Sequence, residues 1–223
     1  MSLPALVLVH GGGLAADSWD LTIEQIERLA PELTVLAIDL PGRRNKPGDL
    51  RTATIADFVD SVIADIDDAD VGDIVIVAHS FAGLTVPGVV AKLGRSRVRE
   101  MVMAAAFVPP EGATMIDTVP FKRVARRGVR RNRPSVTPKW LVRFAYLNGV
   151  PRARRRFMAG KLHSESIAVM AEKVSRRGMP VDIPRTWIFT LRDRALRPKL
   201  QRAPTSGHSV GCTPSSRWTP ATA

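Results

Sequence analysis

The fold is decided by residues 73–83, which read DIVIVAHSFAG. The β-branched run predicts a buried strand over 73–78, and a helix is expected to follow Ser80. A strained backbone at such a junction lifts a serine hydroxyl out of the sheet, and the flanking residues must be small because strand and helix approach closely. The small residues in those places are Ala78, Ala82 and Gly83. The segment therefore predicts a nucleophile at Ser80; the alternative is a plain strand-to-helix turn with an incidental serine.

Outward from this segment, four more apolar runs predict strands, and three segments between the strands are predicted to be helices. The expected strands cover residues 3–9, 33–39, 99–108 and 185–191, and the expected helices cover about 18–30, 54–68 and 81–93. Strands that are almost continuously apolar and alternate with helices are typical of a mostly parallel sheet covered on both faces. We expect an α/β fold of this kind.

The strand–helix alternation stops between about 112 and 184, where the spacing favours helices at about 139–147, 152–161 and 164–176. We therefore expect a core made of residues 1–111 and 185–202, interrupted by a helical, Arg-rich cap insertion at 112–184. Of the 21 residues from 203 to 223, 16 are Ala, Pro, Thr, Ser or Gly. That composition predicts a loosely structured tail.

The net charge of +12 is concentrated in the cap. Between Lys122 and Lys161 there are 14 Lys or Arg and no Asp or Glu, while the rest of the chain holds 19 basic and 21 acidic residues. Three interpretations stay open. The segment is a solvated face, a lid that attracts anionic substrates such as acidic esters or acyl-phosphopantetheine thioesters, or a contact for anionic lipid or nucleic acid.

Composition narrows the function classes. Aromatic residues are 5% of the chain with a single Tyr, so stacking on nucleic acid is not favoured. Cys212 is the one cysteine, which excludes an intrachain disulfide and a cysteine-based metal site. The longest apolar run is far shorter than the roughly 20 residues that span a bilayer. The apolar start lacks a basic segment and a cleavage site, so a cytoplasmic location is expected.

A second site element follows the first strand, where the chain reads His10-Gly11-Gly12-Gly13. The negative oxygen of an acyl intermediate needs two preorganised N–H donors. In a parallel sheet, this loop and the residue after Ser80 reach the same point. The candidate donors are the backbone N–H groups of Gly12 and Phe81, with Gly13 a weaker candidate. A flexible turn is the alternative, since the spacings of a phosphate loop and a dinucleotide fingerprint are both absent.

Residues 6–13, 39–42, 78–83, 107–112 and 191–193 together resemble the α/β-hydrolase fold. Within it, the chain is most similar to compact serine esterases, such as the plant methylesterase and hydroxynitrile lyase group and small bacterial hydrolases. The resemblance covers about residues 3–202. It implies a Ser–Asp–His triad and neither a metal nor an organic cofactor.

The expected acid of the triad is Asp193, because it follows a late strand at the carboxyl end of the sheet. Asp117, after the fourth strand, is the weaker alternative. A further alternative makes Asp193 a surface residue paired with Arg192 or Arg194. In the family that the chain resembles, the base follows the acid along the chain. The resemblance therefore implies His208 as the base, because it alone among the four histidines follows Asp193.

His10 belongs to the glycine loop, His79 is expected to point to the opposite side of the turn at Ser80, and His163 lies in the cap. The tail departs from the family pattern. Only 14 residues separate Asp193 from His208, and neither the strand usual before this histidine nor the helix usual after it is evident.

Two functions follow. The first is a serine hydrolase that cleaves a small-molecule ester or thioester, anionic substrates included, through an acyl-enzyme. The second is a hydrolase-like binding protein whose triad is broken. A serine at position 80 excludes the dehalogenases and epoxide hydrolases of this fold, which need a carboxylate nucleophile. Ser209 stands where the hydroxynitrile lyases carry a lysine, which argues against that activity.

Overall fold

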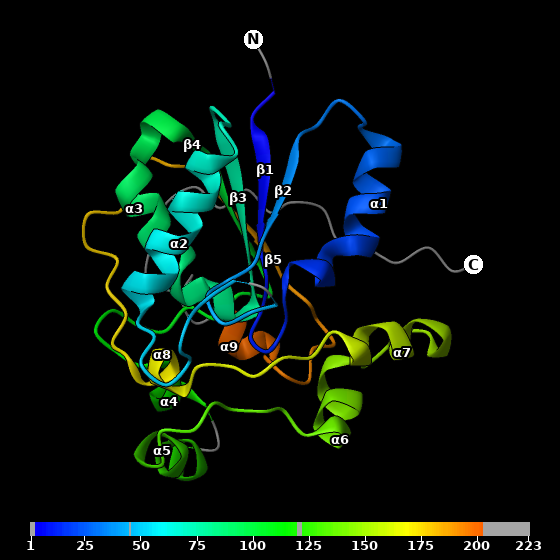
Figure 1. The fold of residues 1–223 in the computed structure, drawn as a ribbon, viewed down its shortest axis with the longest axis vertical. Helices are drawn as coiled ribbons and strands as arrows, with labels where there is room; N and C mark the ends of the chain where they lie inside the picture. Colours follow the sequence, from blue (N-terminus) through cyan, green and yellow to red (C-terminus); the bar gives the residue numbers. More distant parts are fainter. Residues whose placement is uncertain (1–2, 45, 120–121, 203–223) are drawn as a thin grey trace.

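A computed structural model describes residues 3–44, 46–119 and 122–202 of the chain. Five strands form one parallel sheet in the order β2-β1-β3-β4-β5 (Figure 1). They are β1 Ala5–Val9, β2 Val35–Ile38, β3 Ile74–His79, β4 Val98–Ala104 and β5 Arg185–Ile188. Helix α1 (Asp20–Leu29) lies on one side of the sheet, and α2 (Ile55–Asp68) and α3 (Val86–Arg97) lie on the other. The predicted α/β class, with helices on both faces, is confirmed.

Strand β3 is the centre of the sheet. Its register pairs Ala78 with Val9 of β1 and His79 with Ala104 of β4. Because the strands are parallel, their carboxyl ends meet at one edge, where ligand sites of such sheets form. The loops gathered there are residues 10–13, 39–43, 80–84, 105–112 and 189–196.

Helix α2 shows how local sequence and packing agree. The Thr54 hydroxyl accepts a hydrogen bond from the Asp57 backbone N–H (3.1 Å), and the Asp57 carboxylate accepts one from the Thr54 backbone N–H (2.8 Å). This capping box satisfies the first free donors of the helix. Phe58, Val62 and Ile66 lie on the buried face, and the helix predicted over 54–68 is confirmed.

Several predicted elements have different bounds. Strand β4 ends at Ala104 because Ala105 has φ +45° and turns the chain, so that the Phe107 N–H donates to the Ser80 carbonyl (2.7 Å). The helix expected at 18–30 is split into a 3₁₀ turn, η1 (Ala16–Trp19), and α1. The helix expected after Ser80 likewise begins as a 3₁₀ turn, η2 (Ser80–Leu84), before α3.

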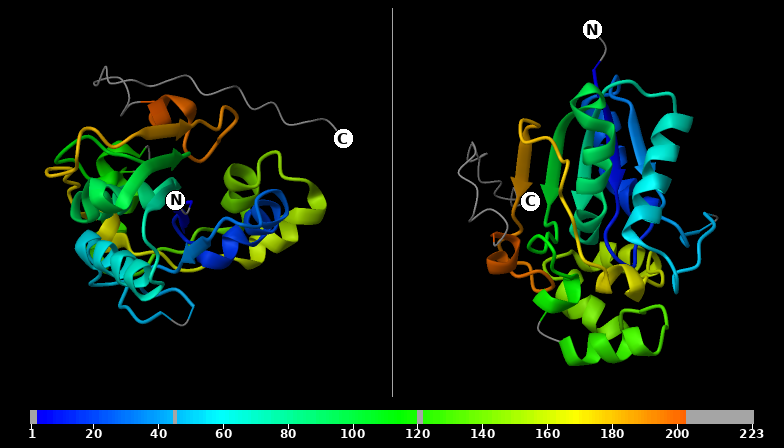
Figure 2. Two further views of the ribbon diagram at one scale, coloured as in Figure 1. Left: turned by 90° about the horizontal axis from the view of Figure 1, so that it is seen from above. Right: turned by 90° about the vertical axis from the view of Figure 1, so that its left-hand side faces the viewer.

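The cap lies beyond the carboxyl ends of the strands (Figures 1 and 2). Its elements are α4 Met115–Thr118, α5 Lys122–Arg130, α6 Lys139–Leu141, η3 Val142–Tyr146, α7 Arg152–Gly160 and α8 Ile167–Ala171, and α9 Pro198–Arg202 follows β5. The helix expected at 164–176 is shorter because the Val174 N–H donates to Ala113 O (3.0 Å), which draws the chain back to the start of the cap. Helices α4 and α5 were not predicted.

Among the residues that the structure describes, no helix has both the length and the apolar character needed to cross a membrane.

Gly83 tests the close approach of the turn after β3 to the chain after β4. A Cβ built on Gly83 would lie 2.4 Å from the Phe107 carbonyl oxygen, a backbone atom that cannot move alone. We expect Gly83→Ala to lower the free energy of unfolding by about 1–3 kcal/mol, measured by urea denaturation. Gly72→Ala is the matched control, since a Cβ there meets nothing within 4 Å. Equal stability of the two variants would contradict the predicted contact.

Candidate active site

Ser80 has a strained backbone at the junction of β3 and η2. Its φ is +50°, in the left-handed region that residues other than glycine rarely adopt. The side chain is half-buried, and the Ser80 carbonyl accepts the hydrogen bond from Phe107 N–H. Such strain persists only where the surroundings impose it, and it is frequent at functional sites. The geometry is that expected for a serine raised at the edge of the sheet.

The glycine loop after β1 lies directly beside this turn. A Cβ built on Gly11 would lie 3.1 Å from Ser80 Cβ, and one built on Gly12 would lie 3.2 Å from Phe81 Cβ. The two predicted donor residues, Gly12 and Phe81, are thus neighbours in space. The Gly13 N–H, in contrast, donates to Glu165 Oε2 (3.0 Å). The Gly13 N–H is therefore already bonded to a side chain, and Gly13 stays the weaker candidate donor.

His10 anchors the start of this loop. Its ring is fully buried, with Nδ1 donating to Gly11 O (2.9 Å) and Nε2 accepting from the Leu40 N–H (3.2 Å). These contacts require the neutral ring with its proton on Nδ1. Burial lowers the pKa of His10 to about 3. His10 thus joins the loop after β1 to the loop after β2 and is a structural histidine.

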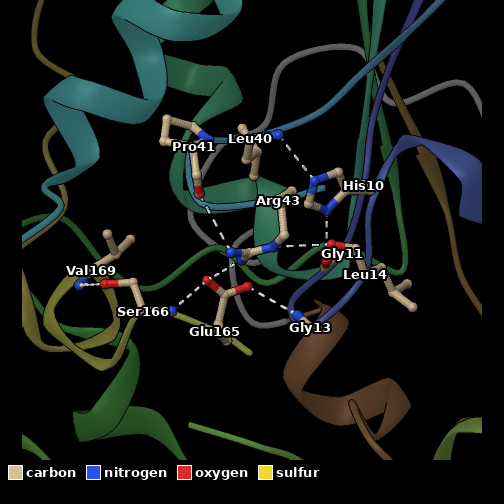
Figure 3. Close-up of polar contacts among 10 residues, drawn as sticks. All are labelled: His10, Gly11, Gly13, Leu14, Leu40, Pro41, Arg43, Glu165, Ser166 and Val169. Carbon is tan, nitrogen blue, oxygen red and sulfur yellow. Dashed lines mark hydrogen bonds and ion pairs between the residues drawn. The ribbon is translucent and has the colours of Figure 1, made fainter. Parts of the chain in front are cut away.

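A buried ion pair connects the loop after β2 to the cap (Figure 3). Arg43, fully buried, places Nη2 at 2.5 Å from Glu165 Oε1, while its Nε donates to Leu14 O (3.0 Å). Glu165 Oε1 also accepts from the Ser166 N–H (2.7 Å). Together with the bond from Gly13, these contacts hold the cap, the glycine loop and the loop after β2 on one carboxylate.

Sequence analysis missed this pair. The available signal was the position of Glu165, which is the first acidic residue after Asp117 in a long basic stretch. An isolated acid in such a stretch has many exposed cationic neighbours, so nothing in the sequence points to Arg43 as its partner. The partner is set by the way the cap folds back onto the edge of the sheet.

Asp193 lies in the loop after β5, as predicted. Its Oδ1 accepts from the Ala195 and Leu196 N–H groups (both 2.8 Å), and its Oδ2 accepts from Thr190 Oγ1 (2.8 Å) and, more weakly, Gln201 Nε2 (3.4 Å). The carboxylate is therefore held in one orientation.

In the described part of the chain, neither of the two arginines beside Asp193 forms an ion pair with its carboxylate. The Arg194 guanidinium lies 5.0 Å from the centre of the Phe144 ring, and the Arg192 carbonyl accepts from Asn148 Nδ2 (2.6 Å). The alternative acid, Asp117, caps α4 through Thr114 and pairs with Arg126 Nη2 (3.1 Å). The Thr114 hydroxyl is the main cause of its lowered pKa.

The histidines gather around the glycine loop. The His163 backbone N–H donates to Gly13 O (2.8 Å), and His79 Nδ1 would lie 2.8 Å from a Cβ built on Gly11. The His79 ring also meets Trp19 edge to face, with the ring centres 5.8 Å apart. His79 therefore lies against the glycine loop. Burial lowers its pKa, and the negative charge of Asp193 opposes that shift.

The predicted base, His208, lies outside the described residues, and its place relative to Ser80 stays a prediction. Within residues 3–44, 46–119 and 122–202, no group of three or more His, Cys, Asp or Glu side chains is placed to hold a metal ion.

Comparison with known proteins agrees with the fold described above. Residues 6–219 match the model of the "Alpha/beta hydrolase family". Among solved structures, an extracellular alpha/beta-hydrolase from a Paenibacillus species superposes with a TM-score of 0.76 at 22% identity, covering 87% of this chain and 81% of that one. A methylesterase from Arabidopsis gives 0.68 at 16% identity, covering 90% and 84%. A polyneuridine aldehyde esterase variant gives 0.69 at 18% identity, covering 89% and 84%.

One curated relative is the (E)-2-((N-methylformamido)methylene)succinate hydrolase of Acinetobacter baylyi, which is 33% identical over 84 residues. That match covers 38% of this chain and 31% of the relative, so the aligned region spans about a third of the relative's length. Since one solved relative is extracellular, the cytoplasmic location stays a prediction.

The burial of His10 makes stability depend on pH. Its native pKa of about 3 lies below the ordinary 6.5, so the unfolded chain binds more protons between these values. The stabilisation is complete above pH 6.5 and is lost as the pH falls toward 3. Between pH 7 and pH 5 we expect a loss of about 2 kcal/mol in the free energy of unfolding.

Urea denaturation at the two pH values measures this loss. His10→Gln cannot titrate, so its pH dependence should be smaller by that amount. The contribution of His79, whose pKa is also lowered, is common to both proteins and cancels in the comparison. Identical pH dependence in the two proteins would refute the assignment.

We expect the Arg43–Glu165 pair to contribute more to the free energy of unfolding than an exposed ion pair does. Glu165→Gln leaves the buried Arg43 charge unpaired, and we expect a loss of about 3–5 kcal/mol in unfolding free energy. The control is Asp182→Asn, which breaks an ion pair with Arg95 whose two side chains are each 59% exposed. That change should cost less than about 1 kcal/mol. Equal effects of the two substitutions would show that the buried pair has no special role.

Proposed function

Because the chain belongs to the alpha/beta hydrolase family, we propose that it is a serine hydrolase that cleaves a small ester or thioester through an acyl-enzyme intermediate. The observation that carries the proposal is the positive φ of Ser80 at the end of β3, beside a glycine loop that can supply N–H donors. Esterases among the structural neighbours support the choice of an ester.

In the proposed mechanism, the Ser80 hydroxyl oxygen attacks the acyl carbon while His208 takes its proton. The same proton then goes to the leaving alcohol or thiol, and water repeats the sequence to release the acid. Asp193 orients His208 and stabilises its charged form. The hydrogen bonds to Asp193 from two backbone N–H groups and from Thr190 support this role, because an acid that orients a base must itself be held.

The oxyanion is assigned to the backbone N–H groups of Gly12 and Phe81. Their close approach supports the pairing, and the bond from Gly13 N–H to Glu165 leaves Gly12 as the donor on this loop. Since the carboxylate of Glu165 is also bound by Arg43, the loop is held before substrate arrives. Donors fixed in advance need no reorganisation during the reaction.

The competing proposal is a hydrolase-like binding protein with an incomplete triad. It is favoured by the 14 residues between Asp193 and His208, a short span for a chain that must return to Ser80. Full extension of that span covers about 45 Å, so length alone does not prevent the contact.

Hydrolysis of p-nitrophenyl acetate and labelling by a fluorophosphonate test the two proposals. We expect Ser80→Ala to abolish labelling and to lower kcat about 10⁴-fold, because the nucleophile is lost. His208→Ala should lower kcat by a similar factor. Ser96→Ala is the control, since that exposed hydroxyl only bonds to the Leu93 carbonyl of its own helix.

Each other outcome has a definite meaning. Hydrolysis that survives in Ser80→Ala removes the serine mechanism. Full activity in His208→Ala moves the base elsewhere, with His79 and His163 the histidines beside the glycine loop. A native chain that neither turns over the ester nor accepts the label is the binding protein.

A further inference from the structure

Helix α5 carries four arginines on one face. Arg123, Arg126, Arg127 and Arg130 follow the spacing that places side chains on one side of a helix, and all four are exposed. The opposite face is built from small residues, and a Cβ on Gly128 would lie 2.6 Å from Ile167 Cδ1. The helix is thus seated against α8 by its small residues, and the arginines face solvent.

Most of this charge is not neutralised within the protein. Arg126 pairs with the Asp117 carboxylate, which also accepts from the Thr114 hydroxyl (2.8 Å). Across the described ranges, no acidic side chain pairs with Arg123, Arg127 or Arg130. Three guanidinium groups therefore stand close together without a counter-charge, which favours the binding of an anion with several oxygens.

Two adjoining hollows lie on this face. One, of about 380 Å³, is lined by the four arginines. The other, of about 510 Å³, shares Arg126 and Arg130 with the first. Its remaining lining is partly apolar and consists of Thr114, Ile116, Asp117, Val129 and Ala171. A cationic hollow beside one with an apolar wall suits a ligand that has an anionic head and an apolar body.

We propose that this surface, the α5 arginine site, binds the phosphate group of a small amphiphile. Guanidinium forks match phosphate oxygens two at a time, and the three arginines without acidic partners supply more donors than a single carboxylate could use. The apolar body of the ligand lies over Ile116, Val129 and Ala171. The phosphate belongs either to a soluble organic phosphate or to a lipid headgroup, and the experiment separates these sources.

A nucleic acid fits this surface less well. Among the residues that the structure describes, no aromatic side chain lines either hollow, so these residues offer bases no stacking platform. The α5 arginine site lies toward the outer end of the cap (Figures 1 and 2), and its lining shares no residue with Ser80, Gly12, Phe81 or Asp193. The proposal therefore stands independently of the serine mechanism.

Calorimetric titration of the full chain with inorganic phosphate and with hexyl phosphate tests the site. We expect hexyl phosphate to bind at least about tenfold more tightly, because its chain covers apolar wall. The triple variant Arg123→Gln, Arg127→Gln, Arg130→Gln should bind it at least about tenfold more weakly. The matched control, Arg152→Gln, Arg154→Gln, Arg156→Gln, removes the same charge from exposed positions of α7 and should change affinity less than about twofold.

Three results would overturn the proposed site: no binding of hexyl phosphate by the native chain, equal weakening in the two triple variants, or no advantage of hexyl phosphate over inorganic phosphate.

Flotation with phosphatidylcholine vesicles, with and without phosphatidic acid, identifies the source of the phosphate. Binding only to vesicles with phosphatidic acid, lost in the α5 variant, assigns the phosphate to a lipid headgroup. Binding of hexyl phosphate without vesicle binding assigns it to a soluble ligand. Tighter binding of RNA than of either probe would also overturn the proposal.

Discussion

The parallel direction of the five strands is the constraint on which the remaining structure depends. It brings the carboxyl ends of all strands to one edge, so that the loops carrying Gly12, Ser80 and Asp193 lie along the same edge although they are far apart in the chain. The order of the strands then sets the distances. Because β3 lies between β1 and β4, Ser80 has the glycine loop on one side and the chain at Phe107 on the other.

The Arg43–Glu165 pair connects this edge to the cap. Two charges removed from water are costly unless hydrogen bonds satisfy them, and here the contacts come from Gly13, Leu14 and Ser166. If the cap moved away from the glycine loop, either Arg43 or Glu165 would lose its partner or become exposed to water. The conformation of the loop and the position of the cap are therefore one coupled feature of the molecule.

The basic residues of the protein are of two kinds, buried and exposed. Arg43, outside the cationic segment, is buried and is held by Glu165 and the Leu14 carbonyl, whereas the arginines of α5 are exposed. The net charge therefore does not describe a uniform surface. Where an arginine lies in the fold decides whether it holds the protein together or remains available to an anion.

The sequence by itself determined the sheet and the turn at Ser80, because both depend on local patterns. The β-branched run before Ser80, the small residues after it and the capping box of α2 each act over a few residues. Such local patterns can be recognised in the sequence. Helix α5 was missed because the sequence around Gly128, which packs against Ile167, shows no apolar period. The tertiary structure alone decided that Glu165 meets Arg43 and that the Gly13 N–H donates to the same carboxylate. Such pairs form between segments distant in sequence, and their partners are chosen by burial and geometry that no local pattern records.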